Sequence, residues 1–208
     1  MKYTNFVFDI DGTLLDTEQT GVLSLIQTVR ELTGTELPYE KAYGLFGIPS
    51  AKAADLLGYA DKARFAEVWE IHFQEMMHLV KPFPGVESVL SDLRAEGART
   101  GVVTSRSKAE IAYDPHLAKL LPYFDIVICS EDSLRHKPHP DPMLTYLRRA
   151  DASADATIYV GDTMHDYGCG HDAGCDFALA DWRGRGMQGI PADYRFCNET
   201  ELRTVLGL

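Results

Sequence analysis

The chain has 208 residues, with 20 Lys and Arg against 31 Asp and Glu, so its formal net charge is −11 with histidine neutral. Such an acidic chain repels the phosphates of nucleic acids and anionic lipids, which excludes a basic nucleic-acid binder as the first interpretation. Apolar residues make up 45% and charged residues 25%, proportions typical of globular domains, so a disordered chain is excluded too. If the substrate is an anion, positive groups must offset the negative field near it.

The N-terminus lacks the pattern of a secretion signal, because Asp9 and Asp11 interrupt its apolar stretch. No apolar run approaches the roughly 18 residues that a membrane-spanning helix needs. The four cysteines have no paired C-x-x-C spacing and indicate reduced thiols. These features predict a cytoplasmic protein with neither a membrane nor a nucleic acid as a partner.

The first predicted element is a buried strand over residues 3–8, which runs into the polar turn Asp9–Thr13. From Asp16 onward the apolar residues follow a helical period instead. Helices are expected from an N-cap at Asp16 or Thr17 to a stop at Gly34 and over residues 38–45, 50–57 and 61–79, and nothing in this block is typical of a strand. The proline-rich segment Lys81–Gly85 ends the helical block.

The rest of the chain alternates between strands and helices. Strands are expected over residues 99–103, 125–129, 157–160, 176–179 and 194–196, and helices over residues 86–93, 108–121, 140–150, 165–173 and 199–206. This alternation predicts an α/β fold, a Rossmann-like parallel sheet with helices on both faces. Because the helical block separates the first strand from the others, we expect a core domain of residues 1–16 and 81–208 and an all-helical insertion of residues 17–80.

Polar residues follow four of the predicted strands. Since parallel strands end at one edge of a sheet, where ligands bind, we expect these side chains to meet in one site. The candidate residues are Asp9, Asp11, Thr104, Ser105, Lys137, Asp162 and Asp166.

The residue types indicate phosphoryl transfer. Up to four carboxylates in one place repel one another unless a cation is present, and hard oxygen ligands suit Mg²⁺. Lys137 adds a positive charge, while Thr104 and Ser105 offer hydroxyl and N–H donors to phosphate oxygens. In such a site one carboxylate can act as the nucleophile and another as acid and base.

Four segments together resemble the motifs of the haloacid dehalogenase-like (HAD) hydrolase superfamily. They are Asp9–Asp16 (DIDGTLLD), Thr104, Lys137-Pro138 and Gly161–Asp166 (GDTMHD). The helical insertion directly after the first motif resembles the α-helical cap of the phosphoglycolate phosphatase and β-phosphoglucomutase branch. The resemblance spans nearly the whole chain.

The resemblance implies a role for each candidate. Asp9 would be the nucleophile that forms an aspartyl-phosphate, and Asp11 would protonate the leaving oxygen and then activate water. Thr104 and Ser105 would bind the phosphoryl group, and Lys137 would neutralise charge. The Mg²⁺ ligands would be Asp9, the backbone carbonyl of Asp11, Asp162 and, directly or through water, Asp166. The expected function is therefore a Mg²⁺-dependent phosphatase acting on a small phosphorylated metabolite, a phosphomonoester like phosphoglycolate or a sugar phosphate.

Other functions were weighed against this one. The dehalogenases of the superfamily lack the second Asp of the first motif, and the mutases carry a cap His near Gly21 and an Arg near Ser50 that this chain lacks. A pyrophosphatase, a phosphosugar mutase and a nucleotide phosphatase stay open as alternatives. A receiver-like domain carries its phosphoacceptor on a middle strand, and a non-catalytic phospholigand-binding protein would be expected to have lost part of the constellation. The sequence does not indicate an oligomeric state.

Overall fold

The computed structural model describes residues 2–46, 48–186 and 189–208. The chain forms two compact units, one made of Met1–Leu15 with Pro82–Leu208 and the other of Asp16–Lys81. The first unit contains the parallel sheet and carries every candidate residue of the sequence analysis.

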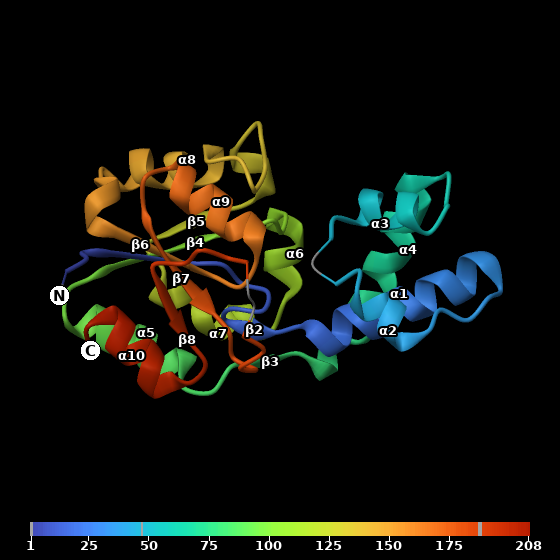
Figure 1. The fold of residues 1–208 in the computed structure, drawn as a ribbon, viewed down its shortest axis with the longest axis horizontal. Helices are drawn as coiled ribbons and strands as arrows, with labels where there is room; N and C mark the ends of the chain where they lie inside the picture. The colour runs from blue at the N-terminus through green and yellow to red at the C-terminus, as the bar shows by residue number, and fades with distance from the viewer. Residues whose placement is uncertain (1, 47, 187–188) are drawn as a thin grey trace. The chain divides into compact units, whose positions relative to one another are not determined.

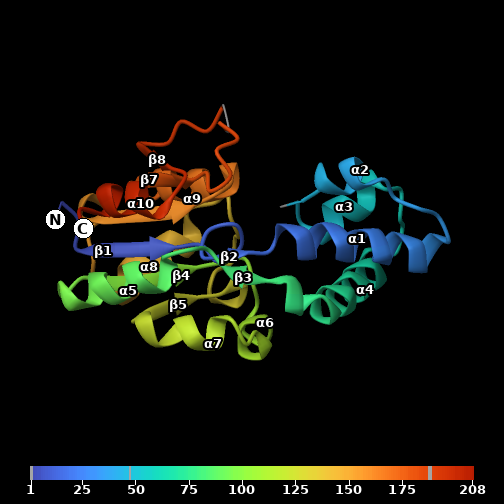
Figure 2. The ribbon, with the colours of Figure 1, turned by 90° about the horizontal axis from the view of Figure 1, so that it is seen from below.

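The core unit is built on a six-stranded parallel sheet in the order β5-β4-β1-β6-β7-β8. The strands are β1 (Asn5–Phe8), β4 (Arg99–Val103), β5 (Ile126–Ile128), β6 (Thr157–Gly161), β7 (Asp176–Ala180) and β8 (Tyr194–Phe196). Figure 2 shows β1, in blue, between the green β4 and the orange β7. The predicted α/β architecture is confirmed.

Helices cover both faces of this sheet. Figure 1 shows α8 (Asp141–Ala150) and α9 (Met164–Asp172) on one face and α5 (Val86–Ala95) and α10 (Glu199–Leu206) on the other. The segment expected as a helix over residues 108–121 is interrupted near Pro115 and forms α6 (Lys108–Tyr113) and α7 (Leu117–Leu120). Three short 3₁₀ helices complete the unit: η2 (Leu121–Tyr123), η3 (Ser130–Asp132) and η4 (Ala154–Ala156).

Successive side chains of β1 point to opposite faces of the sheet and pack into an apolar layer on each face. Val7 packs with Met143 and Tyr146 of α8, whereas Phe8 lies among residues of α5 and α10 such as Leu90. All of these side chains are nearly or fully buried. Because burying each such side chain stabilises the fold by about 1.5–3 kcal/mol, the strand is a rigid support for the residue that follows it.

The second unit packs its helices around its own apolar cluster. Its elements are α1 (Glu18–Thr33), α2 (Tyr39–Tyr43), α3 (Ser50–Leu56), α4 (Lys62–Glu75) and η1 (Met77–Leu79). Leu25 of α1 and Phe65 of α4 are buried in the cluster, and the Trp69 indole N–H donates to Ser24 Oγ at 2.8 Å. No helix in the described ranges is long and apolar enough to cross a membrane.

Two details of the expected boundaries were wrong. The helix expected to reach residue 79 ends at Glu75 and continues as η1. Lys81-Pro82, expected only as a proline-rich break, forms the short strand β3, which pairs with β2 (Leu15–Asp16). Strands this short exist only because a partner from elsewhere in the chain supplies their hydrogen bonds, so local sequence patterns do not reveal them.

Candidate active site

Three polar side chains follow three neighbouring strands at the carboxyl edge of the sheet. Asp9 comes directly after β1, Thr104 after β4 and Asp162 after β6, and β1 lies between the other two strands. The register pairs Phe8 with Val102 and with Val160, so the three strands end at nearly the same level. The sheet therefore brings these three residues together.

The chain turns sharply after Asp9. The carbonyl oxygen of Ile10 accepts hydrogen bonds at 2.9 to 3.3 Å from the backbone N–H groups of Thr13, Leu14 and Leu15. Gly12 has a φ of +73°, and a Cβ at this position would lie 2.0 Å from Oδ2 of Asp162. A glycine is needed here both for its backbone conformation and because the loop passes directly against the Asp162 carboxylate.

Lys137 provides a buried positive charge within this edge. Its Nζ donates to Oδ1 of Asp9 at 2.8 Å, to Oδ1 of Asp166 at 2.7 Å and to the Tyr159 hydroxyl at 3.2 Å. Burial by itself would lower the pKa of Lys137, but the charges of Asp166 and Asp9 outweigh it and raise the pKa above its usual range. Lys137 is therefore a fixed cation beside the expected nucleophile.

Asp166 is fully engaged by protein donors. Its Oδ1 accepts from Lys137 and from the Tyr159 hydroxyl, at 2.7 and 3.0 Å. Its Oδ2 accepts from the backbone N–H and the hydroxyl of Thr163, which begins α9 in a reciprocal capping box. Although burial raises the pKa of Asp166, Lys137 and Thr163 together hold it below its usual value. With two donors on each oxygen, this carboxylate positions Lys137.

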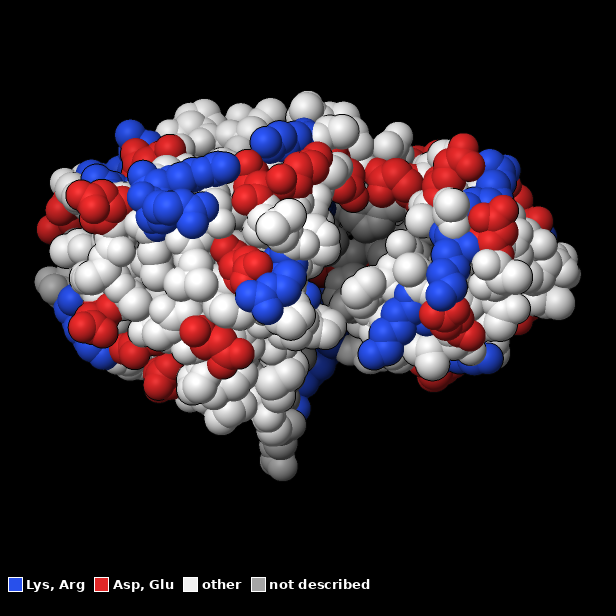
Figure 3. All heavy atoms as spheres, turned by 90° about the horizontal axis from the view of Figure 1, so that it is seen from above, with Lys and Arg blue, Asp and Glu red and all other residues white. Residues whose placement is uncertain are grey.

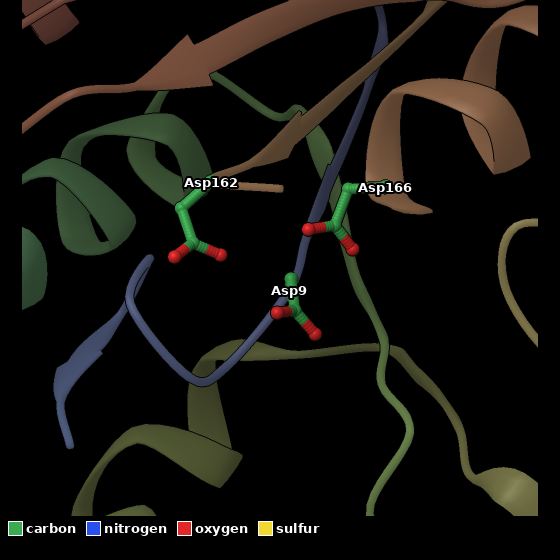
Figure 4. Close-up of side chains that lie close together, drawn as sticks. All are labelled: Asp9, Asp162 and Asp166. Carbon is green, nitrogen blue, oxygen red and sulfur yellow. The ribbon is translucent and has the colours of Figure 1, made fainter. Parts of the chain in front are cut away.

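Asp9, Asp162 and Asp166 form a compact group of carboxylates (Figure 4). One oxygen from each lies within 4.8 Å of the others. Burial raises the pKa of Asp9 to about 7, an effect that the charges of Asp166 and Asp11 increase and that of Lys137 opposes. Burial, together with the charges of Asp166 and Asp9, also raises the pKa of Asp162 well above its usual range.

This group fits a divalent cation. Oδ1 of Asp162 is buried and, in the described part of the chain, has no hydrogen-bond partner. Three carboxylates face a single ammonium group, so the cluster carries uncompensated negative charge when its members are ionised. An all-oxygen donor set with excess negative charge is the type that binds Mg²⁺.

The Asp11 carboxylate lies in a different arrangement from the one predicted. Both of its oxygens accept from the guanidinium of Arg106, at 2.7 and 2.8 Å, and its side chain is 36% exposed. The expected cluster of up to four carboxylates is therefore a group of three, with the fourth carboxylate held by an arginine.

The loop after β4 holds the two predicted hydroxyl residues. Thr104 is buried, and its Oγ1 accepts from the backbone N–H of Arg106 at 3.1 Å. Ser105 is exposed. Ser107, rather than Thr104, caps the following helix α6 through a capping box with Glu110. The hydrogen bond that Thr104 Oγ1 accepts does not use its hydroxyl proton.

Two buried cations lie at this edge of an acidic protein. Over the face drawn in Figure 3, acidic and basic side chains are interspersed. Lys137 and Arg106, in contrast, are 5% and 8% exposed and lie against the site carboxylates. Because each of them is already paired with two carboxylates, an anionic substrate needs further positive charge here, such as a bound divalent cation would supply.

A comparison with protein families identifies the fold. The profile of the haloacid dehalogenase-like hydrolases matches residues 6–180. This chain belongs to that family. It is a HAD hydrolase, as the four motifs predict.

Similar proteins carry names from two activities. Pyrophosphatase PpaX of Bacillus mycoides is 27% identical, over 99% of this chain and 98% of its own length, and a PpaX relative from Caldanaerobacter subterraneus is 31% identical over 88% and 83%. A candidate phosphoglycolate phosphatase from Lactobacillus plantarum has a TM-score of 0.89 at 24% identity and covers 99% and 100% of the two chains. CbbY from Rhodobacter sphaeroides, solved with phosphate, has a TM-score of 0.80 at 20% identity and covers 96% of each. At these identities the structural matches concern the fold alone.

The HAD core brings Asp9, Thr104, Lys137, Asp162 and Asp166 to one edge of the sheet. Three residues that contact this group were not predicted from the sequence: Arg106, Tyr159 and Thr163. The T-x-x-D spacing of Thr163 and Asp166 is a capping-box signal that could have indicated the contact between these two residues. For Arg106 and Tyr159, no comparable local signal exists.

Proposed function

We propose that this HAD hydrolase is a Mg²⁺-dependent phosphatase that hydrolyses a small phosphomonoester through an aspartyl-phosphate on Asp9. The observation that carries the proposal is the pairing of Asp9 with the buried ammonium of Lys137 at 2.8 Å, beside Oδ1 of Asp162, which no described residue hydrogen-bonds. A nucleophile, a fixed cation and a cation-binding oxygen at one sheet edge are the parts that phosphoryl transfer needs.

Asp9 starts the reaction. Lys137 donates to Oδ1 of Asp9, which orients the carboxylate and leaves Oδ2 to attack the phosphorus atom. A bond forms between Oδ2 and phosphorus while the bond from phosphorus to the leaving oxygen breaks. The Thr104 hydroxyl and the backbone N–H groups of its loop supply donors for the phosphoryl oxygens.

Asp11 moves the protons. It delivers a proton to the leaving oxygen in the first half of the reaction. In the second half it accepts a proton from the water that attacks the phosphorus atom, which releases phosphate and restores the Asp9 carboxylate. The two halves together consume one water molecule.

The metal site is assigned to the same residues. Asp9, Asp162 and the backbone carbonyl of Asp11 would hold Mg²⁺, whereas Asp166, whose oxygens already accept hydrogen bonds from the protein, would hold Lys137 in place beside them. When bound, Mg²⁺ supplies positive charge that offsets the phosphoryl oxygens.

The test is phosphate release from a panel of phosphomonoesters, including phosphoglycolate and sugar phosphates, with Mg²⁺ and with a chelator. Release that needs Mg²⁺ and disappears in Asp9→Asn is expected. Asp92→Asn is the control, because this exposed carboxylate of α5 pairs with Arg203 outside the site. No release from any compound by the folded protein would refute the proposal.

Hydrolysis of pyrophosphate is the second candidate. It is favoured by the name of the PpaX relatives, one of which aligns over 99% of this chain. The same half-reactions apply, with phosphate instead of an alcohol as the leaving group. Pyrophosphate in the same panel separates the two candidates by the ratio of their kcat/KM values.

A further inference from the structure

Arg106 is the buried residue closest to the expected acid/base that no motif accounts for. Its Nε and Nη2 donate to the two oxygens of Asp11, and its Nη1 donates to Oδ2 of Asp114 at 2.6 Å. The guanidinium thus connects two carboxylates, one at the site and one in the interior, and its side chain is only 8% exposed.

Asp114 gives Arg106 a rigid anchor. Its side chain is fully buried, and its Oδ1 accepts from the backbone N–H groups of His116 and Leu117, at 2.8 and 3.2 Å, where α7 begins. A planar guanidinium held at one side by such an anchor has little freedom at the other. The orientation is transmitted from the start of α7 through Asp114 and Arg106 to Asp11.

Asp11 needs such an external constraint. It lies in the turn after β1 and its side chain is 36% exposed, so burial alone does not hold it in one rotamer. Proton transfer requires an oxygen within about 2.6–3.2 Å of the group that exchanges the proton. The two parallel hydrogen bonds from Arg106 fix the plane of the carboxylate.

We propose that Arg106 is a positioning residue for the reaction, which orients the Asp11 carboxylate toward the leaving oxygen and the attacking water. The inference rests on the proposed function, because it concerns the group assigned there as acid and base. Its backbone N–H also donates to Oγ1 of Thr104, so one residue of the β4 loop connects the phosphoryl-binding hydroxyl and the proton-transfer group.

The experiment is a double-mutant cycle between positions 106 and 11, measured with the best substrate of the panel. Arg106→Gln is expected to lower kcat roughly tenfold to hundredfold, with KM changed by less than about twofold, because orientation is lost and ground-state binding is not. Arg106→Lys keeps the charge but not the fork, and should recover only part of the loss. In the Asp11→Asn background, Arg106→Gln should have no further effect on kcat.

The control variants separate positioning from folding. Arg203 lies on α10, outside the site, and its guanidinium donates to three side chains of α10 and α5. Arg203→Gln should keep wild-type kcat. If Arg106→Gln unfolds because Asp114 is left as an unpaired buried charge, Arg106→Gln with Asp114→Asn carries the test, since it removes that charge.

Two outcomes overturn the inference. A folded Arg106→Gln with wild-type kcat would do so, and so would losses from Arg106→Gln and Asp11→Asn that multiply in the double variant. If wild type is active and Asp11→Asn keeps a reduced but measurable kcat, either result refutes the inference alone. A wild type inactive on every substrate refutes the proposed function and this inference with it.

Discussion

Replacing Gly12 by alanine tests how the metal site is built. The new Cβ would lie 2.0 Å from Oδ2 of Asp162, and ordinary van der Waals contact begins at 3.4 Å, so the carboxylate or the loop must shift by about 1.4 Å. A displacement of about 1 Å at a catalytic group can lower the rate about a hundredfold. Gly12→Ala should therefore lower phosphate release by roughly that factor and weaken Mg²⁺ binding measured by isothermal titration calorimetry.

Gly97→Ala is the matched control for this substitution. Gly97 has a φ of +74° against +73° for Gly12, but among the described residues no atom beyond its two chain neighbours lies within 4 Å of a Cβ built on it. Both variants carry the backbone cost of about 1–2 kcal/mol for alanine in the left-handed region, and only Gly12→Ala collides with Asp162. If a folded Gly12→Ala binds Mg²⁺ and releases phosphate as well as Gly97→Ala does, the reasoning about the loop and the carboxylate is refuted.

Three further predictions concern charge and hydrogen bonding in the core unit. Burial raises the pKa of Asp9 from 3.8 to about 7, so between these pH values the folded state keeps a proton that the unfolded state loses. The free energy of unfolding without a divalent cation should therefore decrease as the pH rises from about 4 to 7. Thermal melts with Mg²⁺ and with chelator check this, and stabilisation by Mg²⁺ that fails to grow over that range would contradict it. Burial raises the pKa of Asp132, but hydrogen bonds from the protein, one of them from Arg149, outweigh burial and lower it to about 2. Asp132→Asn should therefore reduce the free energy of unfolding by roughly 1 kcal/mol at pH 7, after allowance for solvent screening, and by less as the pH falls from about 4 toward 2. An equal loss at pH 7 and near pH 2, measured by denaturant unfolding, would argue against the ionised carboxylate as the cause. Tyr159→Phe removes the hydroxyl that lies 3.2 Å from Lys137 Nζ. It should lower kcat by up to about tenfold and the free energy of unfolding by about 1–3 kcal/mol. If kinetics and thermal melting give unchanged values, the hydroxyl does not position the lysine.

The order and type of the elements could be predicted from local patterns. The strand expected over residues 194–196 and the helix over 199–206 are β8 and α10, with the same ends. Alternating short apolar strands and amphipathic helices also sufficed to predict a parallel sheet, since that pattern buries both faces of the sheet. The short pair β2 and β3 was missed because its stability depends on pairing between residues more than 60 positions apart in the chain.

The group of site residues could be predicted because parallel strands share one carboxyl edge. That rule alone places Asp9, Thr104 and Asp162 together, without knowledge of any distance. It does not extend to Asp11, because period-two alternation ends where the strand ends, and the turn around Ile10 redirects the chain. The structure consequently pairs Asp11 with Arg106, and its carboxylate is not part of the group of three.

The sequence by itself determined which chemical groups are present and at which edge of the sheet they meet. Only the tertiary structure decided how they are divided: Asp166 is saturated by Lys137, Tyr159 and Thr163, whereas Asp162 keeps a buried oxygen without a partner among the described residues. The physical reason is that a hydrogen bond depends on distances of a few tenths of an ångström and on direction. Lys137 and Asp166 are 29 positions apart and acquire these only when the core packs, whereas the contact with Thr163 is a local capping box.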